Sequence, residues 1–164
     1  MSKKIFLVCM LLCFLGSSFL IAAELKRELY PNGKLKAEWY ESNGKIEGTK
    51  KEYYADGTLK KEESYVGGLP QGTVKDYNPK GQISFEGNFK DGKRDGFVRN
   101  YYDSGQIFSE EHYKEGQLDG EAKRYYMDGT VQYISTFKNG QKTSMKAYNK
   151  KGQLTYDKIY PYIE

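Results

Sequence analysis

A glycine series with nearly constant spacing constrains the fold of this chain more than any other feature. Glycine recurs at intervals of 24, 24, 24, 24 and 23 residues, at Gly33, Gly57, Gly81, Gly105, Gly129 and Gly152. A second series follows at Gly44, Gly68, Gly92, Gly116 and Gly140, and a third at Gly48, Gly72, Gly96 and Gly120, with Ser144 in the fifth place. Such regular self-similarity predicts a repeat architecture, in which a 24-residue unit replaces the globular core as the building block.

The glycines of the first two series mark turns. Each one ends a short cluster of turn-forming residues, such as Pro31-Asn32-Gly33 or Lys138-Asn139-Gly140. A type I turn followed by a left-handed residue favours glycine at that last place, because a Cβ clashes at positive φ. The segments between turns have about six to eight residues, which is too short for helices and typical of strands.

We therefore predict an all-β fold: one elongated, antiparallel sheet, a meander of about twelve strands built from 24-residue β-hairpin repeats. The units start near residues 30, 54, 78, 102, 126 and 149. The strands are expected near residues 25–30, 34–41, 48–54, 58–65, 72–77, 82–89, 96–102, 106–113, 120–126, 130–137, 143–148 and 153–160. All four prolines fall outside these strands, as expected because proline cannot donate to a strand ladder.

Alternation along the first strand of each unit predicts one covered face and one wet face. Ile107 and Tyr113 have the same parity, so we expect both on the covered face. Glu110 has the opposite parity and is expected on the wet face. Glu63 and Glu111 have the parity of the apolar residues, so we expect them near a margin of the sheet.

The second strand of most units ends in tyrosine. The pairs Tyr53-Tyr54, Tyr101-Tyr102 and Tyr125-Tyr126 are complete, whereas Tyr77-Asn78 and Tyr148-Asn149 are reduced. Adjacent residues face opposite sides of a sheet, so each pair places one ring on each surface. By parity, the cations Lys51, Lys75, Arg99 and Lys123 share the face of Tyr53, Tyr77, Tyr101 and Tyr125.

These aromatic and basic residues have two interpretations. In the first, the rings pack over the sheet and stabilise it through cross-strand pairs. In the second, they form a binding surface, because tyrosine supplies much contact area at low entropic cost. The candidate binding residues are Tyr53, Tyr54, Tyr77, Tyr101, Tyr102, Tyr125, Tyr126, Lys51, Lys75, Arg99 and Lys123.

Residues 1–23 are typical of a secretory signal peptide. Two lysines precede an apolar run from Ile5 to Leu15, and small residues stand before Glu24. Two alternatives stay open: an uncleaved anchor, because the segment is just long enough to span a bilayer, and a lipoprotein, because Cys9 and Cys13 lie in the run. We expect residues 24–164 to form the repeat domain and to be exported to the periplasm, the cell envelope or the medium.

Composition excludes several kinds of site. Both cysteines lie in the first segment, so disulfide and thiolate chemistry is excluded for residues 24–164. Without Lys3 and Lys4, basic residues exceed the 22 acidic ones by two, and such a balanced surface argues against nucleic-acid binding. His112 is the only histidine, so neither a catalytic triad nor an imidazole metal cluster can form within one chain. We expect no catalytic residue, no cofactor and no metal.

The recurring pattern Tyr-x-x-Gly-x-Leu…Glu-x-x-Tyr-x-x-Gly-x3-Gly resembles the bacterial variant of the MORN repeat. It runs from Tyr54 to Gly72 and, with Ile for Leu, from Tyr102 to Gly120, and the resemblance covers residues 30–160. It implies an elongated antiparallel sheet of consecutive hairpins. Similar proteins are described as antitoxin-like, or as phosphatidylinositol phosphate kinases, since plant kinases of that type carry similar repeats.

The kinase interpretation fails on the residues themselves. The chain has no Gly-x-Gly, no His-Arg-Asp and no Asp-Phe-Gly sequence. Residues 87–93 match most of a P-loop, but Arg94 replaces the Ser or Thr, and a hairpin replaces the strand-to-helix context that binds phosphate.

These features favour a non-enzymatic, exported repeat protein that acts as a protein–protein interaction module at the cell envelope or surface. Its partner is expected to be another protein. Two alternatives remain: a peripheral membrane or polysaccharide binder that uses the Lys/Tyr face, and an inhibitor of a toxin-like partner, which the antitoxin-like resemblance implies.

Overall fold

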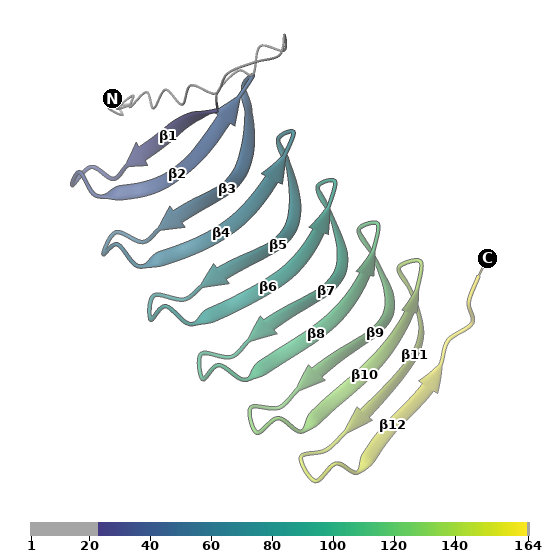
Figure 1. Cartoon of the computed structure of the whole chain (residues 1–164). Helices are drawn as coiled ribbons and strands as arrows, with labels where there is room; N and C mark the ends of the chain where they lie inside the picture. Colours follow the sequence, from purple (N-terminus) through teal and green to yellow (C-terminus); the bar gives the residue numbers. More distant parts are fainter. Residues whose placement is uncertain (1–22, 164) are drawn as a thin grey trace.

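The computed structural model describes residues 23–163, which form a single antiparallel sheet with its strands in sequence order (Figure 1). The strands are β1 Glu24–Leu29, β2 Leu35–Ser42, β3 Lys45–Tyr53, β4 Leu59–Val66, β5 Leu69–Tyr77, β6 Ile83–Lys90, β7 Lys93–Tyr101, β8 Ile107–Lys114, β9 Gln117–Tyr125, β10 Val131–Lys138, β11 Gln141–Tyr148 and β12 Leu154–Ile159. The predicted all-β meander is confirmed. The signal-peptide prediction lies outside the described residues, apart from Ala23.

The glycines of the first series lie in turns of the predicted type. At the β1–β2 turn, Gly33 N donates to Tyr30 O at 2.9 Å and Tyr30 N donates to Lys34 O at 2.8 Å. Gly33 has a φ of 81°, in the left-handed region that glycine adopts without a steric penalty. The same positive φ occurs at Gly57, Gly81, Gly105, Gly129 and Gly152.

The glycines of the second series close a different turn from the predicted one. At the β2–β3 turn, Asn43 has a φ of 51° and Gly44 a φ of 72°, which together make a two-residue turn of type I′. The following strand therefore begins directly after the glycine, so that β7 starts at Lys93 and not near residue 96. The prediction was wrong because an Asn-Gly or Asp-Gly cluster suits both turn types.

The glycines of the third series lie inside strands, at β-bulges. Between the pairs Glu111–Ala122 and Tyr113–Leu118, three residues of β9 oppose His112 alone. Gly120 lies in this bulge with a φ of 110°, a value that L side chains rarely adopt.

The bulge of β11 accounts for the serine in the fifth place. Only Thr143 and Ser144 oppose Thr136 there, one residue fewer than in the other four bulges of this kind. Ser144 does not have a positive φ. The missing residue also explains why the spacing from Gly129 to Gly152 is 23 rather than 24 residues.

A second irregularity, near the start of the even-numbered strands, exchanges the faces of the sheet. Tyr101 pairs with Ile107, but the next pair skips Phe108, which is an extra residue in β8. Ile107 therefore lies on the face of Tyr101, while Tyr113 lies on the other face. The prediction that Ile107 and Tyr113 share one face is wrong, because it assumed an unbroken period of two.

The buried residues lie on one face, which we call the packed face. They are small: the buried hydrophobic residues are Ala37, Val74, Val98 and Ala122. A sheet without a second layer can cover only small side chains, by laying longer neighbours over them. Gly87 shows this cover, since a Cβ built there would lie 2.8 Å from Cζ of Phe85 and 3.3 Å from Cε2 of Phe89.

Two glutamates of the packed face do not lie at the margin expected for them. Glu63 is in the middle of β4 and only 8% exposed. Its carboxylate accepts the Tyr65 hydroxyl at 2.7 Å and pairs with Lys61 Nζ at 3.0 Å. Glu111 accepts the Tyr113 hydroxyl at 2.8 Å in the same way. Buried carboxylates are tolerated where neighbours supply hydrogen bonds and opposite charge, as here.

Replacing Gly87 by alanine tests the cover by the two phenylalanine rings. We expect Gly87→Ala to lower the free energy of unfolding by about 1–3 kcal/mol, because the added methyl forces the rings off their present positions. Ser135→Ala is the matched control: this residue lies in the same row of the packed face, and its buried Oγ has no hydrogen-bond partner among residues 23–163. Urea unfolding should show the control to be neutral or stabilising, and an equally tolerated Gly87→Ala would contradict the packing described.

Candidate functional site

A row of charged side chains crosses the whole sheet on the face opposite the packed face, which we call the charged face. Every strand contributes one residue, and successive residues stand directly opposite each other. From β1 to β12 the row is Arg27, Glu38, Lys51, Glu62, Lys75, Glu86, Arg99, Glu110, Lys123, Ile134, Lys146 and Asp157. Positive and negative charges alternate at every step except at Ile134, so the row is almost neutral.

The ion pairs in this row differ in strength. Arg99 Nε lies 2.6 Å from Glu110 Oε2, and this hydrogen bond raises the pKa of the guanidinium. The pairs Lys51–Glu62 and Lys75–Glu86 are longer, at 3.6 and 3.8 Å, and remain partly exposed. Exposed pairs each contribute little to stability. Alternation nevertheless avoids like charges on neighbouring strands, which would destabilise the sheet.

The first tyrosine of each pair lies on the charged face beside the row. There the structure brings together Tyr53, Tyr77, Tyr101 and Tyr125 with Lys51, Lys75, Arg99 and Lys123. The Tyr53 hydroxyl donates to Glu38 at 3.0 Å, and the Tyr101 hydroxyl donates to Glu86 at 3.3 Å. Burial, together with these carboxylates, raises the pKa of both phenols. These two hydroxyls are therefore engaged by the sheet itself.

The second tyrosine of each pair holds neighbouring units together. Tyr102 Oη donates to the carbonyl of Tyr125 at 2.7 Å, and Tyr54 and Tyr126 make the equivalent bonds to Tyr77 and Tyr148, at 2.7 and 3.1 Å. The Tyr102 ring also packs edge-to-face on Phe108, with centroids 5.0 Å apart. Tyr54, Tyr102 and Tyr126 are half-buried, so a structural role accounts for them.

Three residues of the charged face depart from the repeat. Phe97 stands where the other units have Thr49, Thr73 and Glu121, and its ring is 49% exposed. His112 stands where Ser64, Asn88 and Thr136 recur, and Ile134 replaces the acid of the charged row. Phe97 on β7 pairs directly with His112 on β8, and Ile134 on β10 pairs directly with Lys123 on β9. The irregular residues therefore gather on β7–β10.

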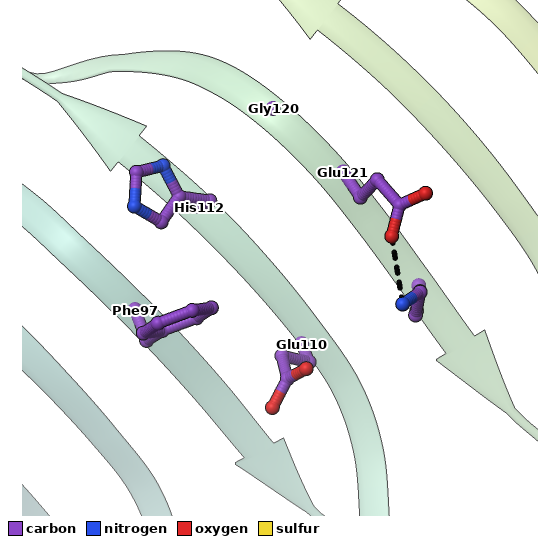
Figure 2. Close-up of a pocket in the computed structure, with 6 residues that line it drawn as sticks. Phe97, Glu110, His112, Gly120 and Glu121 are labelled. Atoms are coloured by element: carbon purple, nitrogen blue, oxygen red, sulfur yellow. Dashed lines mark ion pairs between the residues drawn. The ribbon is translucent and has the colours of Figure 1, made fainter.

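A shallow pocket of about 370 Å³ lies on the charged face at this place (Figure 2). Its lining residues are Phe97, Glu110, His112, Gly120, Glu121 and Lys123. The Phe97 and His112 rings meet edge-to-face, with centroids 5.0 Å apart. Figure 2 also shows the ion pair of Glu121 with Lys123, which measures 2.7 Å.

His112 is held in one orientation by the backbone. Its Nδ1 lies 2.7 Å from the carbonyl oxygen of Asp119. A carbonyl only accepts hydrogen bonds, so Nδ1 carries the proton, and Nε2 of the neutral ring is an acceptor. Glu110 lies on the same face as His112, whereas Glu111 lies on the packed face. The pocket thus offers an aromatic ring and hydrogen-bond acceptors, an arrangement suited to binding.

Only Lys123 of the predicted binding residues lines this pocket, although Arg99 lies over the Phe97 ring at 5.6 Å. Parity reasoning found the regular rows and missed Phe97 and Ile134. A comparison of the units position by position is the signal that would have found them, because both break a recurring residue type.

The packed face carries a cluster of charges around Lys61. Burial lowers the pKa of Lys61, but the hydrogen bond and charge of Glu63 outweigh this and raise it overall. Burial raises the pKa of Asp76, and the charges of Glu63 and Glu52 add to the effect, against the opposing charge of Lys61. Asp76 Oδ1 is buried and has no hydrogen-bond partner within the described chain. The negative charge of Asp76 therefore destabilises the fold.

Within residues 23–163, no group of three or more His, Cys, Asp and Glu side chains is placed to hold a metal ion. The same stretch forms no helix with the length and hydrophobicity needed to cross a membrane.

The tyrosine hydroxyl bonds are testable by removing one. Tyr102→Phe should lower the free energy of unfolding by about 0.5–1.5 kcal/mol, because the carbonyl of Tyr125 loses its partner. Tyr40→Phe is the control, since Tyr40 is 48% exposed and its hydroxyl makes no hydrogen bond with any described residue. If chemical denaturation shows equal stability for both variants, the hydroxyl of Tyr102 has no structural role.

The raised pKa of Asp76 predicts that the free energy of unfolding depends on pH. A raised pKa in the folded state means that folding favours the protonated carboxyl. The stability from this group is fully present below its unfolded pKa of about 3.9 and is lost as pH rises through the folded pKa. Asp76→Asn should therefore raise the urea midpoint at pH about 7 and change it little at low pH. Asp128→Asn, an exposed turn residue whose pKa is lowered by backbone hydrogen bonds with Thr130, should not raise that midpoint.

Comparisons with known proteins identify the family and little beyond it. The chain matches a family model described as MORN repeat variant at residues 46–66, 70–91, 94–115 and 118–139, which together make up more than half of the sequence. A comparison with curated proteins gave no match. Among solved structures, the chain is similar to a mutant of TarM from S. aureus in complex with fondaparinux, alpha-GlcNAc-glycerol and UDP. The identity is 11%, the TM-score 0.31, and the match covers 85% of this chain and 21% of that one.

The structural similarity is too low to carry an argument, whereas the match to the family model spans four consecutive hairpins. MORN repeats are in general protein- or membrane-binding modules and are non-catalytic. The matched segments begin at the second residue of β3, β5, β7 and β9, and they end at the last residue of β4 and one residue beyond β6, β8 and β10. The chain belongs to the MORN repeat variant family.

Proposed function

We propose that this protein is a non-enzymatic, exported interaction module that binds another protein at the cell envelope or surface, through the charged face around Phe97. The observation that carries the proposal is a ring 49% exposed at the centre of a face whose other charged and aromatic side chains are largely paired. Aromatic residues in such positions are typical anchors of protein interfaces.

Repetition separates structural from functional residues here. A side chain that the fold requires recurs in most units, as the tyrosine–carbonyl bonds of Tyr54, Tyr102 and Tyr126 and the alternating charges do. Phe97 and Ile134 do not recur, and the fold is complete without them in the other units. Phe97 also has Arg99 over its ring and His112 at its edge. Aromatic residues with an adjacent arginine are enriched at binding hot spots.

The pairing of charges favours a protein partner over an anionic membrane. Binding to anionic lipid needs cations that are free to approach headgroups. Along the charged row, Lys51, Lys75 and Arg99 each face a glutamate on the neighbouring strand, so their charge is largely compensated. A mixed, nearly neutral face on which the Phe97 ring is exposed instead matches the composition of protein interfaces. An antitoxin-like inhibitor would be one form of such a protein binder.

Export is the second part of the proposal and is supported by the residue pattern at 1–23. Cleavage before Glu24 would release a chain that begins directly at β1. Mass spectrometry of the protein recovered from fractionated source cells should therefore find Glu24 as the first residue, in a fraction outside the cytoplasm. A chain that retains Met1–Ala23 in the membrane fraction would instead support the anchor.

Substitution of Phe97 tests the binding face. The protein should capture a defined partner from envelope fractions, and Phe97→Ala should weaken that binding by about 2 kcal/mol, or roughly thirtyfold. Titration of the purified partner against both proteins measures the change. The matched control is Tyr40→Ala, which removes another exposed ring from the charged face, far from the pocket.

Two results would count against the proposal. Equal loss of binding in Phe97→Ala and Tyr40→Ala would place the contact elsewhere on the face. Flotation with vesicles of anionic lipid that persists at physiological salt, without any protein partner, would favour the peripheral membrane alternative. Retention on purified envelope polysaccharide would likewise favour a sugar-binding role.

A further inference from the structure

The last strand of the sheet has an open edge. β12 pairs with β11 on one side, and no described strand lies on its other side (Figure 1). All six of its residues are exposed, including Leu154 at 52% and Ile159 at 83%. Natural proteins protect such edges with prolines, bulges or several charges, because the free backbone groups recruit further strands. Residues 154–159 contain no proline, and the one extra residue of β12, Thr155, lies near the start of the strand, so the stretch from Tyr156 to Ile159 continues without a bulge. Its charged residues are Asp157 and Lys158.

The charged row ends with complementary charges at the two edges of the sheet. At every even-to-odd step except that from Ile134, an acid on the even strand faces a cation on the following odd strand, as Glu62 faces Lys75. β12 supplies the acid Asp157, but no odd strand follows it. β1 supplies the cation Arg27, but no even strand precedes it among the described residues. Each edge therefore carries the partner that the other one lacks.

We propose that the free edge of β12 binds β1 of a second copy of this chain, so that the antiparallel meander continues from one molecule into the next. The occupant follows from the register. Within the sheet, each odd-numbered strand pairs with the preceding even-numbered strand in one register. If β1 of the second copy pairs with β12 in that register, its Arg27 lies opposite Asp157. The same register places Leu25 opposite Ile159, an apolar pair on the charged face. Both strands have six residues, so the edges match in length.

One pair in this register is unfavourable. Lys158 lies opposite Lys26 of the second copy, and like charges across a strand pair are destabilising. Lys26 is already paired with Glu24 at 2.7 Å, which compensates its charge. Pairing of β12 with β12 of a second copy is less favourable, because the register centred on Asp157 places two Asp157 carboxylates against each other. The neighbouring register centred on Tyr156 leaves Lys158 opposite Leu154.

This contact joins different surfaces of the two molecules and leaves a free edge at each end. Such a heterologous contact produces open chains unless the geometry closes a ring. The association is independent of the binding face around Phe97, which lies on β7 in the interior of the sheet.

A charge exchange tests the contact. Protein purified after expression of the full-length chain should show a mass that grows with concentration in analytical ultracentrifugation. Arg27→Glu or Asp157→Lys should each weaken this self-association about tenfold, since attraction becomes repulsion. The double variant restores opposite charges across the interface and should recover the association. Lys51→Glu, which changes the same charge in the interior of the row, should leave the association unchanged.

Cysteine crosslinking identifies which edges meet. Chains with Leu25→Cys and chains with Ile159→Cys should form a disulfide-linked dimer on oxidation when mixed, and neither variant should do so alone. The unsubstituted chain controls for Cys9 and Cys13. A monomer at every concentration, a double variant without recovery, or dimers from Ile159→Cys alone would each overturn the head-to-tail contact.

Discussion

A sheet with one layer has no second layer against which to bury an apolar face, so contacts between neighbouring strands must supply what a core supplies in other domains. The consequence is visible in what is buried. The largest fully buried side chains are Val74, Val98 and Ser135, and no aromatic ring is among them. Rings lie over the small residues and stay half-exposed, as Phe85 and Phe89 lie over Gly87. The high aromatic content of the chain is therefore first a means of covering a thin sheet.

The same constraint organises the polar residues. Without a core, both faces meet water, and each strand is held mainly by its two neighbours. Alternating charges join adjacent strands. Hydroxyl bonds such as that of Tyr102 to Tyr125, and turn amides that donate to the preceding unit, join neighbouring units. Gly92 N, for example, donates to Pro70 O at 2.9 Å. Each bond is modest alone, and recurrence across the sheet makes the array stable.

The sequence predicted the number and order of strands because glycine marks the turns directly. Proline was a weaker guide, since Pro70 was expected outside the strands and lies within β5, paired with Tyr65. It did not predict which face a residue occupies where a bulge lies in the strand, because the bulge changes the alternation of faces without a recognisable residue. Phe108 is an extra residue in β8, yet it reads as an ordinary strand residue. Strict alternation correctly placed Lys51 and Tyr53 on the same face, because no bulge lies between them in β3. It wrongly placed Ile107 and Tyr113 on the same face, because a bulge lies between them in β8. The pocket was not predicted for a different reason. The sequence was searched for residues that recur in each unit, and Phe97 does not recur.

Function in a repeat array is expected at positions that the array leaves unconstrained, which here are the irregular residues of one face and the two edges. These two surfaces do not compete, because the pocket lies on interior strands and the edges lie at the ends (Figure 1). If β1 of one copy extends the sheet of another, the charged faces of both copies continue into each other. Every added molecule then presents another Phe97 pocket on the same face, and linked copies of one site bind a clustered partner far more tightly than a single site does. Weak binding by one shallow pocket is therefore compatible with firm attachment to a surface where the partner is abundant.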